Sequence, residues 1–165
     1  MSVVQAVDVG AQSKTAPGAS LVELMNAHVG SSWQGQSSEC CCKCIRSDNT
    51  TTLTKTPNGS FVLSHVSKSK ILWCIPYTMR ITETFSADCR SSTIVLDNKP
   101  HCNGSSTLTA FDPATGVANY LNNMQDHVKG HSIQAHLTWD FRGGARDTTS
   151  RHSAGTSTGH MELVR

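Results

Sequence analysis

Cysteine is the residue with the most versatile chemistry in this chain, and four of its seven cysteines fall within residues 40–44. Cys41 and Cys44 are separated by two residues, which is the spacing of half a zinc site. A complete site needs two more ligands, and the adjacent pair His101 and Cys102 is the best candidate for them. The sequence therefore allows one structural zinc ion, held by Cys41, Cys44, His101 and Cys102, and predicts no other cofactor.

The same cysteines have two other interpretations. Disulfides from the cluster to Cys74, Cys89 or Cys102 would suit an extracellular protein. However, the number of cysteines is odd, and residues 1–19 lack the basic start and apolar run of a signal peptide. Reduced thiols are therefore favoured. Since no apolar run is long enough to span a bilayer, we expect a place in a virion or the cytoplasm rather than secretion.

Catalytic motifs are absent from the sequence. It has no nucleophile elbow, no phosphate-binding loop, no dinucleotide-binding turn and no zinc-protease helix. His127, His131 and His136 are close in sequence, but a charged histidine near a helix end is an ordinary structural feature. We therefore expect no enzymatic activity.

Basic residues are unevenly distributed. Residues 43–90 hold seven Lys or Arg against three acidic residues, and the segment 142–165 has a smaller basic excess. Such a surface suits a phosphate backbone. The candidate nucleic-acid contacts are Lys55, Lys70, Arg80, Arg142 and Arg146.

Two helices are expected from capping signals. Ser20 and Glu23 have the spacing of a capping box, which predicts a short helix over about 21–29. Asp112 followed by Pro113 has the pattern of an N-cap and first helical residue, and Gly130 supplies a stop. Together with an apolar stripe, these signals predict a longer helix over about 113–129.

Strands are expected in most of the remaining chain. Two β-prone runs flank the turn 57–59 as a hairpin, and further strands are predicted over 70–85, 92–97, 106–111 and 132–141. Residues 31–48 have no clear period and are expected to form a loop. The fold class is therefore α+β, with a mainly antiparallel sheet of about five to six strands and a final strand over about 132–141.

One domain is expected from the chain length of 165 residues. We expect an arm over 1–19, a single α+β domain over 20–141, and a tail over 142–165. The tail is so rich in Gly, Ser, Thr and Arg that it should not order by itself. We find no internal repeat.

Low charge is the main indication of function. Only 16% of residues are charged, and threonine alternates along the predicted strand at 50–56. Such a face packs against copies of itself at a low desolvation cost. We therefore expect a non-enzymatic structural protein that forms a homo-oligomer or a larger particle, as virus or phage coat and decoration proteins do. The alternatives are a Cys-stabilised extracellular binding module and an RNA- or zinc-binding accessory protein.

Overall fold

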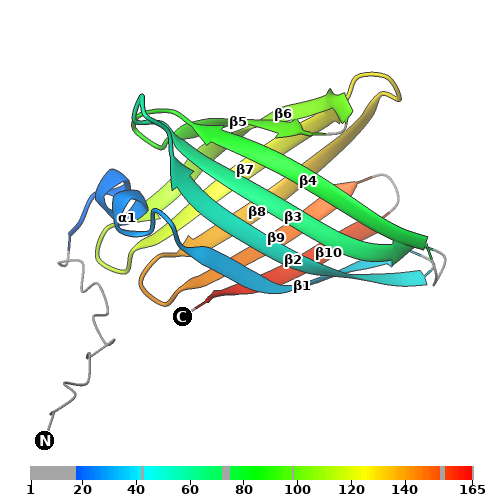
Figure 1. Ribbon diagram of the computed structural model, residues 1–165, viewed down its shortest axis with the longest axis horizontal. Helices are drawn as coiled ribbons and strands as arrows, with labels where there is room; N and C mark the ends of the chain where they lie inside the picture. The colour runs from blue at the N-terminus through cyan, green and yellow to red at the C-terminus, as the bar shows by residue number, and fades with distance from the viewer. Residues whose placement is uncertain (1–17, 42, 72–74, 98, 153–154, 165) are drawn as a thin grey trace, which may run out of the picture.

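The fold is a closed antiparallel β-barrel with one short helix at one end (Figure 1). The computed structural model describes residues 18–41, 43–71, 75–97, 99–152 and 155–164. The elements are α1 (Leu21–Ala27), β1 (Ser32–Cys41), β2 (Lys43–Lys55), β3 (Phe61–Ile71), β4 (Ile75–Phe85), β5 (Ser91–Leu96), β6 (Lys99–Asp112), β7 (Val117–Asp126), β8 (His131–Asp140), β9 (Ala145–His152) and β10 (Gly155–Leu163). The predicted α+β class with a long helix is therefore wrong.

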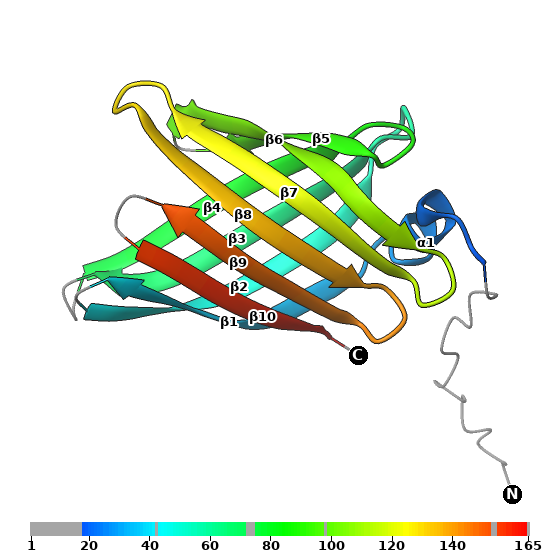
Figure 2. The same cartoon turned by 180° about the vertical axis from the view of Figure 1, so that it is seen from behind.

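The topology is a simple meander. Each strand pairs with the strands before and after it in the chain, and β1 closes the ring by pairing with β10 (Figure 2). This last pairing runs from Trp33 opposite Leu163 to Cys40 opposite Thr156. Because the first and last strands pair with each other, no strand of the sheet is left with a free edge among the described residues.

Helix α1 lies across one end of the barrel (Figure 1). Its start agrees with the sequence: the backbone N–H of Ser20 donates to the carboxylate of Glu23, and the backbone N–H of Glu23 donates to the hydroxyl of Ser20. The buried residues Leu21, Leu24 and Met25 join the aromatic core of the barrel. That core gathers at the α1 end of the strands, with Trp33 and Trp139 in edge-to-face contact at 5.2 Å.

The predicted helix over 113–129 is instead a turn, strand β7 and a second turn. Three consecutive hairpins share one Asp-x-x-x-Gly loop, repeated every 14 residues: Asp112–Gly116, Asp126–Gly130 and Asp140–Gly144. In each loop the Asp carboxylate accepts a backbone N–H two residues later, and the Gly has a positive φ. Helix N-caps and Gly stops use the same chemistry, which explains the error.

The spacing of the apolar residues of β7 fits a helix as well as a strand. Tyr120 and Met124 are four residues apart, so they share a face in a helix and in a strand alike. The structure places them inward together with Ala118 and Asn122. The three loops also correct our expectation that the chain has no internal repeat.

Three strands, β1, β9 and β10, and the first half of β2 were missed because their inward residues are small or polar. Residues 31–48, expected to form a loop, contain β1 and the first part of β2, and the inward positions of these two strands include Gly35, Ser37 and Asn49. The segment 142–165, expected to be a disordered tail, contains β9 and β10 and completes the barrel. Period-2 hydrophobicity is absent from these segments, so the usual strand signal is absent too.

Other predictions from the sequence are confirmed. α1 and the hairpin of β2 and β3 around residues 57–59 form as expected. The expected strands at 92–97, 106–111 and 132–141 correspond to β5, the end of β6, and β8. The long strand expected over 70–85 is β4 from Ile75 onward. Residues 1–17 of the predicted arm lie outside the described residues.

Closure of the barrel depends on a close approach at Gly35. This residue of β1 pairs with Met161 of β10, and a Cβ atom added to it would clash with the carbonyl oxygen of His160. Gly159 lies on the partner strand opposite Ser37, where an added Cβ would lie 3.1 Å from a side-chain carbon. Of these two glycines, only Gly35 has backbone atoms where an added Cβ would lie.

We expect Gly35→Ala to lower the free energy of unfolding by about 1–3 kcal/mol, because the clash forces β1 away from β10. Chemical denaturation followed by tryptophan fluorescence measures this loss. Gly159→Ala is the matched control and should lose much less, since its added Cβ needs only a small shift away from Cβ of Ser37 and overlaps no backbone atom. Equal losses in the two variants would contradict this account of the closure.

Candidate functional site

The barrel interior contains a cavity of about 490 Å³ in the half that lies away from α1. Its rim is formed at the ends of the hairpins β5–β6, β7–β8 and β9–β10, with Lys99, Lys129 and His152 among the residues there. At the other end the interior is filled by the aromatic core and α1. The volume lies within the range of about 300–1,000 Å³ that is usual for small-molecule sites.

Strand alternation determines which side chains reach the cavity. Every second residue of an antiparallel strand in a barrel points inward, so each strand contributes a short column to the wall. Small inward residues on β1, β9 and β10, such as Ser37, Ser150 and Gly159, leave the space open. The opposite wall is largely apolar and consists of Met79, Ile81, Ile94, Leu96, Met124 and Ile133.

The inner part of the cavity is polar. Arg146 of β9 is 6% exposed, and its Nη1 donates to the hydroxyl oxygen of Thr51 at 3.3 Å. That same oxygen lies 2.7 Å from Nδ1 of His65. Glu83 is 4% exposed and accepts a hydrogen bond of 2.5 Å from the hydroxyl of Ser92. The inner wall of the barrel thus holds a guanidinium, an imidazole and a carboxyl group.

Burial shifts the pKa of each of these groups. Desolvation lowers the pKa of Arg146 to about 10, against the attraction of Glu83, so the guanidinium stays charged at neutral pH. Desolvation, together with the charge of Arg146, lowers the pKa of His65 to about 3, which keeps this imidazole neutral. The pKa of Glu83 is raised by burial, although Ser92 and Arg146 oppose the shift.

Two polar atoms on the cavity wall have no partner. Nε of Arg146 and Oδ1 of Asn122 are buried, and neither forms a hydrogen bond within the described part of the chain. Buried polar atoms are normally satisfied, so this donor and this acceptor are groups on the cavity wall that a bound molecule could satisfy. The cavity is therefore suited to a molecule that is apolar along most of its length and polar at its inner end.

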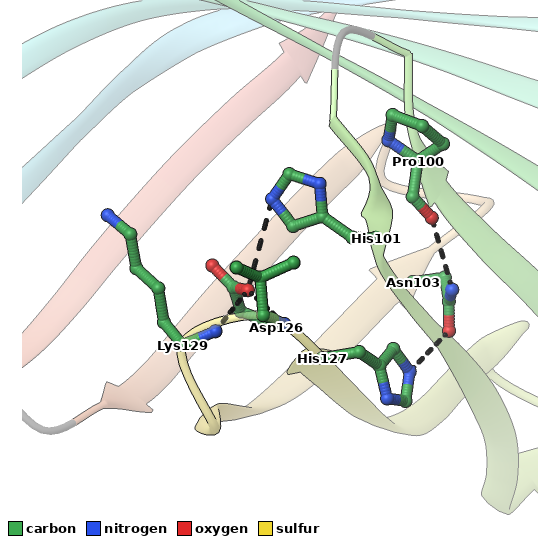
Figure 3. A network of polar contacts seen from close by, with 7 residues as sticks. Pro100, His101, Asn103, Asp126, His127 and Lys129 are labelled. Atoms are coloured by element: carbon green, nitrogen blue, oxygen red, sulfur yellow. Dashed lines mark hydrogen bonds and ion pairs between the residues drawn. The ribbon is translucent and has the colours of Figure 1, made fainter.

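The metal-ligating residues predicted from the sequence are only partly brought together. His101 and Cys102 lie at the rim beside Asp126, with Nε2 of His101 3.9 Å from Oδ1 of Asp126 (Figure 3). Cys41 and Cys44 belong to the β1–β2 hairpin, which lies several strands away from β6 in the ring. The side chains of residues 39–44 lie outside the described part of the structure, so the predicted four-residue zinc site stays a prediction.

The disulfide interpretation is not supported where the thiols are described. Cys89 and Cys102 are both free, and Cys74 lies outside the described residues. Burial raises the pKa of the Cys89 thiol to about 11, so this group is protonated and unreactive at neutral pH. Cys102 is partly exposed at the rim.

The predicted nucleic-acid contacts do not form one surface. Arg146 is buried inside the barrel, so it is not part of an outer surface, and its predicted contact with a phosphate backbone stays a prediction. The other four residues are exposed, but Lys55 and Arg142 lie at the α1 end, Lys70 lies at the opposite end, and Arg80 projects outward from β4. Lys55 donates to Oδ1 of Asn26 on α1 at 2.7 Å, which is a structural contact. Nucleic-acid binding stays a prediction, because the predicted basic residues do not gather into one surface patch.

Glu83 and His65 were missed as functional residues, although the sequence contained a signal. The expected strand over 70–85 places Tyr77, Met79, Ile81 and Phe85 on its apolar face, and Glu83 occupies the one charged position in that alternation. A charge at an inward position of a strand is costly and marks a site.

Comparison with known proteins adds no assignment. No protein-family model matches this chain, no curated protein matches its sequence, and no solved structure matches its fold. The site must therefore be interpreted from its own chemistry. Within the described residues, no helix has the length and apolar character needed to cross a membrane.

His65, whose imidazole is partly buried and desolvated in the cavity wall, makes the stability of the protein depend on pH. In the unfolded chain this imidazole has its ordinary pKa of 6.5 and binds a proton below that pH, whereas the folded state keeps it neutral down to about pH 3. Its contribution to stability is therefore complete above pH 6.5 and is lost as the pH falls, by up to about 2 kcal/mol at pH 5. Denaturation curves at pH 7 and pH 5 measure it.

The control for this prediction is His65→Gln, which retains a polar side chain without a titrating group. Glu83 acts in the opposite sense, because a raised pKa makes its contribution fall as the pH rises. The difference between the wild type and the variant isolates His65 from this second effect. Parallel loss of stability in the two proteins would contradict the burial of a neutral imidazole.

Proposed function

We propose that this protein binds a small amphipathic carboxylate inside its barrel. The observation that carries the proposal is the buried, unpartnered Nε of Arg146 on the wall of the cavity. The carboxylate would lie against this guanidinium, and the apolar part of the molecule would extend toward the rim.

The apolar part of the ligand is supported by the composition of the wall. Two methionines and four branched aliphatic residues face the cavity from β4, β5, β7 and β8. Methionine is flexible and adapts to ligands of different shape. Transfer of apolar surface from water into this wall stabilises the complex by roughly 25 cal/mol per Å². The wall itself makes no demand for a specific hydrogen-bonding pattern.

The negative charge of the ligand is supported by the state of Arg146. No carboxylate lies within 4.0 Å of its guanidinium among the described residues, and its one hydrogen bond goes to a neutral hydroxyl. A buried cation without a contacting anion is costly to fold around. A ligand carboxylate would supply that anion and accept from Nε and a terminal nitrogen in the two-pronged geometry that guanidinium favours.

Glu83 does not remove the need for an anionic ligand. It attracts Arg146 across the interior, but its carboxylate lies beyond ion-pair distance of the guanidinium, and Nε of Arg146 has no acceptor among the described residues. The hydroxyl of Ser92 already occupies one of its oxygens. Glu83 therefore stabilises the charged form of Arg146 from a distance and accepts no hydrogen bond from it.

The proposal predicts that decanoate binds more tightly than decan-1-ol, which has the same chain but no charge. A charge-assisted hydrogen bond in a dry site contributes about 1.5–3 kcal/mol, so the preference should be roughly ten- to a hundredfold. Isothermal titration calorimetry on the full chain measures both affinities. Equal affinities, or tighter binding of the alcohol, would overturn the anionic assignment, and no binding of either compound would overturn the function.

Arg146→Met tests the same assignment from the protein side. It removes the charge but keeps an unbranched apolar side chain, so it should abolish the preference for decanoate and leave decan-1-ol binding close to unchanged. Arg151→Met is the matched control, since Arg151 lies on the same strand and is exposed. The Arg151→Met variant should bind decanoate and decan-1-ol with the affinities of the wild type.

Assembly with copies of itself, expected from the sequence, stays a prediction. A closed barrel offers no free strand edge among the described residues, so an assembly would have to use outward faces such as the threonines of β2. The mass in solution, measured by light scattering, tests this second role: a defined large species supports it and a monomer at high concentration contradicts it. Ligand binding in the barrel is compatible with either result.

A further inference from the structure

A second site lies at the rim of the cavity, on β6 and β7. One ligand atom each from His101, Cys102 and Asp126 lies within 4.8 Å of the others, and all three residues are partly buried. Figure 3 shows the imidazole of His101 directed toward the carboxylate of Asp126 at the start of the β7–β8 turn. A nitrogen, a sulfur and an oxygen donor thus converge from two neighbouring strands.

This convergence needs an irregular strand, because adjacent residues of a regular strand point to opposite faces. The irregularity is present. Leu96 of β5 pairs with Lys99, whereas its neighbour Val95 pairs with Asn103, so the residues between Lys99 and Asn103 bulge from the ladder. His101 and Cys102 both lie in this bulge, and Cys102 is directly opposite Asp126 in the pairing of β6 with β7.

The surrounding hydrogen bonds hold the cluster in place. Oδ1 of Asp126 accepts the backbone N–H groups of Val128 and Lys129 at 3.0 and 2.9 Å, which fixes the orientation of the carboxylate (Figure 3). The backbone N–H of His127 donates to the carbonyl of His101 at 3.0 Å. Metal ligands are typically supported by such outer contacts, because they reduce the cost of ordering the donors.

Zinc is the ion whose preferences fit these donors. It binds imidazole nitrogen, thiolate sulfur and carboxylate oxygen with bonds of about 2.0–2.3 Å, so its ligand atoms lie about 3.3–3.8 Å apart. The 3.9 Å between His101 and Asp126 is already close to that separation. Thiolate and carboxylate together balance the charge of a divalent cation, while calcium and magnesium prefer oxygen ligands alone.

We propose that His101, Cys102 and Asp126 bind a zinc ion at the mouth of the barrel cavity. Three protein ligands leave the fourth tetrahedral position for water or another small donor. Cys102 and Asp126 both line the cavity, so this open position lies where a molecule enters the barrel. The site retains two of the four ligands predicted from the sequence and replaces the cysteines of the β1–β2 hairpin with Asp126. It does not depend on carboxylate binding at Arg146.

Cobalt titration of the reduced, metal-free full chain tests the site. Co²⁺ substitutes for Zn²⁺, and a thiolate ligand produces a charge-transfer absorption in the near ultraviolet. Cys102→Ser should abolish this band and weaken cobalt affinity at least tenfold, and Asp126→Asn and His101→Ala should weaken it similarly. His127→Ala is the matched control, because that neighbouring imidazole lies 3.1 Å from Asn103 and outside the cluster. It should bind cobalt as the wild type does.

The cysteines of the β1–β2 hairpin require a second variant, because they also offer thiolates. Replacement of Cys40, Cys41, Cys42 and Cys44 by Ser should leave a charge-transfer band that Cys102→Ser then removes. If the band disappears with the hairpin cysteines and is insensitive to Cys102→Ser, the metal belongs to the hairpin and the proposal is overturned. Zinc should also raise the thermal midpoint of the four-serine variant, and its failure to do so would overturn the proposal independently.

Discussion

The pairing of β1 with β10 is the interaction on which the rest of the structure depends. Without it the sheet would have two free edges, and its concave face would be open to water along its length. With it the ten strands enclose an interior, and α1 and the aromatic core fill one end of it. Closure requires strand backbones to approach at Gly35, where any side chain would meet the carbonyl of His160.

Closure of the barrel removes water from the polar residues of its interior and so changes their chemistry. In an open sheet, Arg146 would be hydrated and unremarkable. Inside the barrel the same guanidinium loses its water, its pKa falls to about 10, and its Nε has no acceptor. Burying a charged guanidinium lowers the free energy of unfolding, because the group loses its water. A bound anion would offset that cost. The fold and the proposed function are therefore linked through one buried charge.

The sequence predicted the elements whose signals are local. The capping box at Ser20 and the turn at 57–59 need only neighbouring residues, and both form as expected. The segments that line the cavity were missed, because Ser37, Ser150 and Gly159 replace the apolar residues that would reveal a strand. Asp112 and Gly130 led to a false helix prediction for another reason. An Asp that accepts backbone N–H groups and a Gly with a positive φ occur both at helix ends and in hairpin turns. At the rim, His101 and Cys102 were identified, but Asp126 is brought to them only by strand pairing.

The side-chain N–H of Arg146 reports most directly on the central claim that the barrel holds a buried cation whose Nε has no acceptor until an anionic ligand binds. Nuclear magnetic resonance resolves arginine Nε–Hε groups, and Arg146→Met assigns the signal. The account predicts a slowly exchanging Hε that shifts downfield on addition of decanoate, while the signals of exposed arginines such as Arg151 stay in place. A rapidly exchanging Hε, or a titration that shifts only the exposed arginines, would contradict it.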